Sequence, residues 1–312
     1  MASPKGTPLF RHNVGVKPVL AFALACSAQI CFSQEFPEIR VEKIVQQQKF
    51  TEGPVWSLEG FLLFSDTVTD KIQKFMPGKG ASDYVSKAGG AAGNAYDEQG
   101  RLYACEFRER RITRTDKKGK VDIIASKFEG KRFNAPLDVV VRRDGNVYFT
   151  DPAFGNQQDT RELDFYGVFH VTPKGEIEAI SRSKTRPHGV ALAPNGRTLY
   201  VSDADTRSIR AYDLDRSGAA SNERVIVNKL EAIPGGIRTD DKGNLYVAAK
   251  GVDIFTPKGE LLKQISLAEP ASNLAFGDSD FATLFVTART SVYRIRLGSI
   301  KGSLQYAPSP PQ

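Results

Sequence analysis

Short apolar runs, each entered through a turn, recur at regular intervals along this chain. Five of the turns contain a glycine, at positions 60, 100, 145, 196 and 243, and these glycines are separated by 40, 45, 51 and 47 residues. A sixth run without the glycine covers residues 283–288. Runs of this length, rich in β-branched and aromatic residues, predict strands. The interval matches one four-stranded blade, so the repeat predicts a β-propeller.

A second hairpin pattern follows several of these runs. Apolar residues flank a Lys-Gly turn at residues 112–119, 168–175 and 254–259, and such turns are the usual short-range signal of a hairpin. No stretch has a sustained helical period. We therefore predict an all-β fold, a six-bladed β-propeller of four-stranded blades over 50–300. The segment 34–49 is expected to join the closing blade, and 301–312 to form a Pro-rich flexible tail. A pair of β-sandwiches would not explain the repeat.

The same repeat predicts which residues surround the central channel. In a propeller the first strand of each blade lines the channel, and the residue that enters this strand points into its mouth. Eight positions before each turn glycine stands a residue that is followed by Gly or Asp and then by an apolar strand. Aligning Leu284 with Leu199 adds the sixth blade. The predicted ring consists of Glu52, Ala92, Leu137, His188, Gly235 and Asn273.

Composition and charge narrow the function classes. The chain has 312 residues and a formal net charge of +7, and its length and apolar content suffice for a large core. No block of Lys and Arg with interleaved aromatic residues is present, so a nucleic-acid partner is not expected. There is also no glycine-rich phosphate loop, no Cys/His zinc cluster and no Gly-x-Ser-x-Gly elbow. The expected partner is a small-molecule substrate, and the oligomeric state is not predicted.

The first 33 residues are typical of an export signal. The basic residues Lys5, Arg11 and Lys17 precede an apolar run over 19–32, and small residues follow at the position that a signal peptidase reads. The run is short for a transmembrane helix. We expect a periplasmic or secreted protein with no membrane association after cleavage. The mature chain would keep only Cys105, which excludes an intramolecular disulfide and is expected in the core.

Four strings of residues resemble a known family. They are Thr51-Glu52-Gly53-Pro54-Val55-Trp56, Arg132-Phe133-Asn134-Ala135-Pro136-Leu137-Asp138, Tyr148-Phe149-Thr150-Asp151-Pro152 and Pro187-His188-Gly189-Val190-Ala191. In this order and at blade spacing they are similar to the SMP-30/gluconolactonase/luciferin-regenerating enzyme family, from about residue 50 to 296. The resemblance implies a six-bladed propeller with one divalent cation, usually calcium, at the channel mouth, and a lactonase activity.

The resemblance places the family's metal ligands at positions that hold Glu52, Leu137, His188 and Gly235 here. Only the glutamate matches the family's pattern. Calcium takes six to eight oxygen ligands, whereas leucine and glycine side chains offer none and imidazole is a poor calcium ligand. These residue types disfavour calcium, although Glu52 and His188 could hold a softer metal such as zinc.

The ring leaves three hypotheses about function open. Glu52 and His188 lie three blades apart, so they are expected to face each other across the mouth, where they could act as acid and base in lactone hydrolysis. Donors to the oxyanion could be Arg132, Arg238 or Asn134, and Leu137 and Asn273 are further candidates for substrate contact. The same pair could serve another metal-free reaction. Alternatively, the pocket only binds a small molecule or a protein. Because half of the ring is small or apolar, we expect a ligand less polar than a sugar lactone.

Other residues in the motifs are expected to have structural roles. Acidic residues end four of the inner runs and are expected to cap loops; they are Asp66, Glu106, Asp151 and Asp203. Asp138 follows a ring position and is expected to anchor neighbouring backbone. Trp56, the one tryptophan, is expected to pack in the core, and His170 to be structural.

Overall fold

A computed structural model describes residues 1–4, 6, 36 and 39–306 of this protein. Most of the predicted signal segment, including Cys26 and Cys31, lies outside the described residues, as does 307–312. Residues 1–35 and 36–312 form separate units, and the following account concerns the second. Within the described part, no helix has the length and apolar character needed to cross a membrane.

Six four-stranded antiparallel sheets make up the fold, as the repeat predicted. Blade 1 contains β2 (Thr51–Ser57), β3 (Phe61–Asp66), β4 (Lys71–Met76) and β5 (Gly80–Ser86). Blade 2 contains β6 (Ala91–Tyr96), β7 (Leu102–Glu106), β8 (Arg111–Thr115) and β9 (Val121–Ala125). Blade 3 contains β12 (Val139–Val141), β13 (Val147–Asp151), β14 (Tyr166–Val171) and β15 (Ile177–Ser183).

The second half of the ring repeats this plan. Blade 4 contains β16 (Pro187–Leu192), β17 (Thr198–Asp203), β18 (Ser208–Leu214) and β19 (Ala220–Val227). Blade 5 contains β20 (Ile237–Thr239), β21 (Leu245–Ala248), β22 (Val252–Phe255) and β23 (Leu261–Ile265). Blade 6 contains β24 (Asn273–Gly277), β25 (Thr283–Ala288) and β26 (Ser291–Arg296). Outside the blades lie a short hairpin of β10 (Lys127–Phe128) and β11 (Lys131–Arg132), and the 3-10 helix η1 (Gly155–Thr160).

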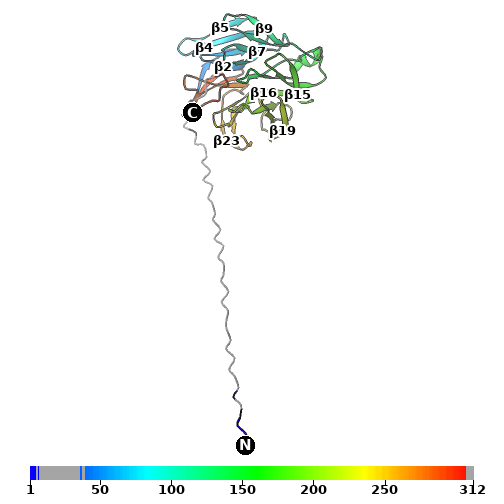
Figure 1. Cartoon of the computed structure of the whole chain (residues 1–312). Helices are drawn as coiled ribbons and strands as arrows, with labels where there is room; N and C mark the ends of the chain where they lie inside the picture. The colour runs from blue at the N-terminus through cyan, green and yellow to red at the C-terminus, as the bar shows by residue number, and fades with distance from the viewer. Residues whose placement is uncertain (5, 7–35, 37–38, 307–312) are drawn as a thin grey trace. The chain divides into compact units, whose positions relative to one another are not determined.

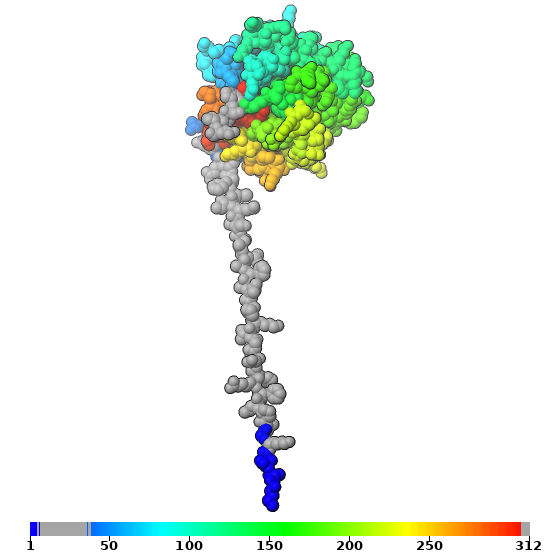
Figure 2. Space-filling model, viewed as in Figure 1, coloured from blue at the N-terminus to red at the C-terminus, as the bar shows by residue number. Residues whose placement is uncertain are grey.

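The N-terminal strand β1 (Val41–Val45) closes the ring by pairing with β26 at the outer edge of blade 6. The blades follow one another around the ring in chain order (Figure 1). In Figure 2 the orange and red atoms of the last blade lie beside the blue atoms of the first. Strands from the two ends of the domain therefore share one sheet.

Close approach between neighbouring first strands explains why glycine follows several ring positions. A Cβ on Gly53 would lie 1.9 Å from the carbonyl oxygen of Ala92, one blade further on. A Cβ on Gly93 would lie 2.6 Å from the Leu137 oxygen, and one on Gly189 2.5 Å from the Gly235 oxygen. Real Cβ atoms do not approach backbone oxygens this closely, so the motif reflects packing around the channel.

Hydroxyl groups at the ends of second strands link one blade to the next. Ser65 Oγ donates to the Ala92 oxygen at 2.9 Å, Thr150 Oγ1 to the His188 oxygen at 2.6 Å, and Ser202 Oγ to the Gly235 oxygen at 2.6 Å. Each acceptor belongs to a ring residue. The hydrogen bonds thus fix the backbone that presents the ring side chains to the mouth.

The acidic residues that end these strands hold the loops beside the mouth. The Asp66 carboxylate accepts the N–H groups of Lys49 and Phe50 at 3.0 and 3.2 Å, and Phe50 stands two residues before Glu52. Asp151 accepts the N–H groups of Asn134 and Ala135, both at 2.8 Å. These carboxylates therefore have the capping role expected from the sequence.

Residues 302–306 return to the other end of the channel and close it. Ser303 N–H donates to the Thr239 oxygen at 2.9 Å, and the Tyr306 hydroxyl donates to the Trp56 oxygen at 2.6 Å. Gln305 is buried and donates to the Ala193 oxygen at 3.2 Å. A cavity of about 60 Å³, lined by inner-strand residues of all six blades, lies above this segment. The first residues of the expected flexible tail are thus packed against the propeller.

Candidate functional site

Five of the six predicted ring residues line the open end of the channel. Two adjoining lobes, with volumes of about 340 and 480 Å³, share Phe50, Glu52 and His188. The first lobe extends over blades 1–3 and includes Ala92 and Leu137. The second extends over blades 5 and 6 and includes Gly235. The residues predicted to form the ring thus mark the mouth of the channel. The two lobes meet at the ring's two titratable side chains, Glu52 and His188.

Glu52 is a buried carboxyl group at the junction of the lobes. The residue is only 4% exposed, and the Gly53 N–H donates to the carboxylate at 3.1 Å. Burial, and to a lesser extent the Asp138 carboxylate, raise the pKa of Glu52 to about 7. The Gly53 N–H, the Asn273 amide and the Arg238 guanidinium oppose this rise. Near neutral pH the group can therefore both accept and release a proton.

His188 borders the same two lobes from blade 4. Burial lowers its pKa to about 4, a shift that the Asp138 carboxylate only partly opposes. The imidazole is therefore neutral at pH 7, with one N–H donor and one acceptor nitrogen. Its Nδ1 is buried and has no hydrogen-bond partner among the described residues. The Phe154 ring lies 5.8 Å from the imidazole and covers one side of it.

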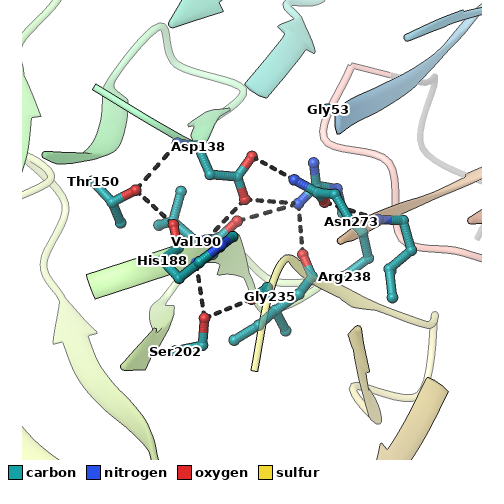
Figure 3. Close-up of polar contacts among 12 residues, drawn as sticks. Gly53, Asp138, Thr150, His188, Val190, Ser202, Gly235, Arg238 and Asn273 are labelled. Carbon is teal, nitrogen blue, oxygen red and sulfur yellow. Dashed lines mark hydrogen bonds and ion pairs between the residues drawn. The ribbon is translucent and has the colours of Figure 1, made fainter. Parts of the chain in front are cut away.

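Polar side chains from blades 3, 5 and 6 meet around Asp138 (Figure 3). Asp138, Arg238 and Asn273 all influence the pKa of Glu52, so this layer lies close to that carboxyl group. Asp138 accepts from Arg238 at 3.4 Å, from Asn273 Nδ2 at 3.3 Å and from the Val190 N–H at 3.1 Å. Arg238 also donates to the Ile237 oxygen at 2.6 Å and lines the lower cavity. Asp138 thus anchors backbone, as expected, and it also forms an ion pair that the sequence did not indicate.

The other predicted site residues have different positions. Arg132 is exposed and donates to the Glu109 oxygen, and Asn134 is buried, with its amide donating to the Asp151 and Phe165 oxygens. Neither lines the two lobes. Arg238 and Asn273 belong to the layer around Asp138. Of the proposed substrate contacts, only Leu137 faces the mouth directly.

The donor set at the mouth does not fit a calcium ion of the family's type. Leu137 and Gly235 add no side-chain oxygen to Glu52, and the Asp138 carboxylate is already paired with a guanidinium. Among the residues that the structure describes, no three His, Cys, Asp or Glu side chains are grouped as metal ligands would be. With only two donors, Glu52 and His188 also provide fewer ligands than the usual zinc site.

Three residues outside the mouth pack against neighbouring side chains and have structural roles. His170 contacts the Asn146 Oδ1 at 2.5 Å and stacks on Tyr148 with the ring centroids 5.0 Å apart. Cys105 is fully buried, and burial raises the pKa of its thiol well above the ordinary value. Trp56 stacks on Phe285 with a centroid distance of 5.2 Å. All three are packed inside blades or between them.

Comparison with known proteins places this geometry in context. Residues 50–290 match the family model described as the SMP-30/Gluconolactonase/LRE-like region. A curated gluconolactonase from Zymomonas mobilis is 33% identical over 288 residues, which covers 82% of this chain and 81% of that protein. A curated relative that matches over most of this chain is therefore a gluconolactonase.

Solved structures agree with this assignment. A gluconolactonase from Xanthomonas campestris is 30% identical and superposes with a TM-score of 0.78, covering 83% of this chain and 90% of that one. A calcium-binding protein, regucalcin from Agrobacterium tumefaciens, has a TM-score of 0.71 at 17% identity over 84% of this chain and 94% of that one. At that identity the similarity shows the fold alone.

Proposed function

Because the chain belongs to the SMP-30/gluconolactonase/LRE-like family, we propose that it hydrolyses a lactone at the mouth of its channel, with Glu52 and His188 as the reacting pair. One observation carries the proposal. Glu52 is a buried carboxyl group with a pKa of about 7, and it borders the same two lobes as the neutral imidazole of His188. Perturbed titratable groups in a concave pocket mark candidate catalytic sites.

In the proposed reaction the Glu52 carboxylate removes a proton from a water molecule while the water oxygen bonds to the lactone carbonyl carbon. The carbonyl oxygen takes up the negative charge, and the imidazole N–H of His188 donates a hydrogen bond to it. The ring C–O bond then breaks, and Glu52 returns its proton to the leaving oxygen. The product is the open-chain hydroxy acid, and Glu52 is again a carboxylate.

The two pKa values support this division of roles. A base is most effective when its pKa lies near the working pH, which fits Glu52. A group with a pKa of about 4 stays unprotonated at pH 7 but is a weak base, so His188 serves better as a hydrogen-bond donor. No protein ligand set for a metal is needed in this scheme.

A panel of lactones tests the proposal. Purified protein should open at least one lactone, with kcat/KM that rises about tenfold per pH unit below 7 and levels off above it, because Glu52 must be ionised. Overnight treatment with a chelator should leave the rate unchanged. Loss of activity on chelation, restored by calcium, would contradict the metal-free scheme. A folded protein without activity on any lactone would favour a binding module instead.

We also propose that the protein is exported, on the basis of residues 1–33. Fractionation of cells that produce the full chain should place the processed protein in the periplasm or the medium. A protein that keeps its N-terminal residues and stays in the cytoplasm would contradict this proposal.

A further inference from the structure

The walls of the two lobes are poor in polar groups that could bind a polyhydroxylated ligand. Six of the ten residues that line the first lobe are apolar: Phe50, Ala92, Phe107, Ala135, Leu137 and Phe154. Its Thr67 hydroxyl already donates to the Phe50 oxygen, and the Gln157 Oε1 already accepts the Phe154 N–H. The Gln157 amide N–H and the Thr67 oxygen could meet only a few groups of a sugar lactone, whose other buried hydroxyl groups would lack partners, and this costs free energy. The first lobe therefore suits an alkyl or aromatic group.

The second lobe combines apolar walls with two cations. Ile233, Pro234 and Ala271 contribute apolar surface, while Lys250 and Arg289 stand at the edge. Both cations are exposed, and neither forms an ion pair within the described part of the chain. In contrast, the guanidinium of Arg238 beneath the ring is paired with Asp138.

Acidic groups are scarce around these cations. Among the residues that line the two lobes, Glu52 alone is acidic, and it lies at the junction of the lobes. The nearby Glu269 carboxylate is occupied by Lys43, Thr290 and Ser291. The exposed Glu231 precedes the lining residue Ala232 but does not itself line the lobe. Two cations without ion-pair partners among the described residues thus stand beside an otherwise apolar pocket, and such a site attracts an anionic group.

We propose that the substrate is a lactone with an apolar body and an anionic substituent, such as a carboxylate, that binds Lys250 and Arg289. The proposal rests on the proposed hydrolysis. The lactone ring would lie between Glu52 and His188, its apolar part in the first lobe and its anion at the edge of the second. Lys250 and Arg289 are specificity residues here, since they would touch the substrate away from the reacting carbonyl.

Matched substrates provide the test. A δ-lactone with an alkyl chain ending in a carboxylate is compared with its methyl ester and with gluconolactone. We expect kcat/KM for the carboxylate to exceed that for the ester by about fivefold to tenfold, a range typical of two partly exposed ion pairs. Gluconolactone should be the poorest of the three. A preference for gluconolactone, or equal rates for acid and ester, would overturn the proposal while hydrolysis itself would stand.

Variants of the two cations distinguish loss of carboxylate binding from a general defect in the folded protein. In the Lys250→Gln, Arg289→Gln double variant the ratio of the two kcat/KM values should fall towards one, because only the carboxylate loses its partners. A structural defect would lower both rates and leave the ratio as it was, and that outcome would also overturn the proposal. The matched control is Lys258→Gln, an exposed lysine of blade 5 outside both lobes, which should keep the wild-type ratio.

A second measurement keeps the two proposals distinct. Calorimetry with a cyclic ether analogue that carries the same carboxylate chain measures binding without hydrolysis. Tighter binding of this analogue than of its methyl ester, lost in the double variant, would support the anion site even if no lactone is opened. Equal affinity of the wild-type protein for the two analogues would contradict the anion site.

Discussion

The two ends of the channel are built from the same six strands but differ in almost every chemical respect. The open end has two lobes, a carboxyl group and an imidazole with shifted pKa values, and exposed cations. The closed end has a cavity of about 60 Å³ with mainly apolar walls, and the C-terminal segment seals it. The residues that begin the first strands vary in chemistry, whereas those further along are mostly apolar. A propeller can therefore change its chemistry at one end while the other end supplies packing.

The largest expected effect is the loss of lactone hydrolysis when the proposed base at the open end is replaced. Glu52→Gln should lower kcat/KM at pH 8 by about 10² to 10⁴, the usual contribution of a general base. The matched control is Glu59→Gln, an exposed glutamate in the turn after the same strand. If Glu52→Gln keeps more than a tenth of the activity, Glu52 is not the base.

The same variant should be more stable than the wild type at high pH. The folded-state pKa of about 7 lies above the ordinary value of 4.5, so the stability contributed by neutral Glu52 is complete below about 4.5 and is lost as the pH rises to 7. Glutamine does not ionise, so the free energy of unfolding at pH 8 should rise by about 3 kcal/mol. Urea titrations at pH 4.5 and 8 measure the difference, which should be near zero at the lower pH.

Truncation tests the closed end. Removal of 303–312 deletes the hydrogen bonds of Ser303, Gln305 and Tyr306 and exposes apolar channel wall, so the free energy of unfolding should fall by about 3 kcal/mol. Lactone hydrolysis by the folded variant should stay within about twofold of wild type. Removal of 307–312 alone is the control. A large loss of activity in the folded 303–312 deletion would show that the two ends are coupled.

A smaller effect links the open end to the polar layer around Asp138. The Asp138 carboxylate contributes to the raised pKa of Glu52, so Asp138→Asn should move the acid limb of the kcat/KM profile to lower pH, by about half a unit to one unit. Loss of packing alone would reduce the rate without moving the limb. Asp83→Asn, at an exposed site on β5, is the control.

The smallest expected effect concerns one hydrogen bond at the closed end. Tyr306→Phe removes the donor to the Trp56 oxygen and should cost about 1 kcal/mol of unfolding free energy, with activity unchanged. Tyr84→Phe, an exposed tyrosine of β5, should cost nothing measurable. Equal effects from the two substitutions would mean that the Tyr306 bond contributes no stability.

The sequence predicts the blades and the mouth because both depend on local spacing. A fixed distance from each turn glycine to a ring residue reflects the length of one hairpin, so Glu52, Ala92, Leu137, His188 and Gly235 could be placed together. The ion pair of Asp138 with Arg238 could not be predicted from this spacing, because its partners come from blades 3 and 5 and meet through a long side chain. Asn134 and Arg132 were predicted as substrate contacts only because they stand in a motif. In the structure the Asn134 amide instead donates to two loop carbonyl oxygens, those of Asp151 and Phe165.

The C-terminal segment shows the same limit. Residues 302–306 contain no alternating pattern and precede a proline-rich stretch, so composition favoured a tail. Their position depends on contacts with Thr239, Ala193 and Trp56, and these partners are distant in sequence. Local propensity cannot predict such contacts.

The pairing of β1 with β26 has a consequence for synthesis. The strand that completes blade 6 is among the first parts of the domain to leave the ribosome, while its partner is among the last. Until β26 has been synthesised, β1 lacks its hydrogen-bonded partner strand. The unfinished ring then presents open strand edges, which favour aggregation. A nascent chain of this protein is therefore expected to present such edges for longer than a chain whose contacts are local.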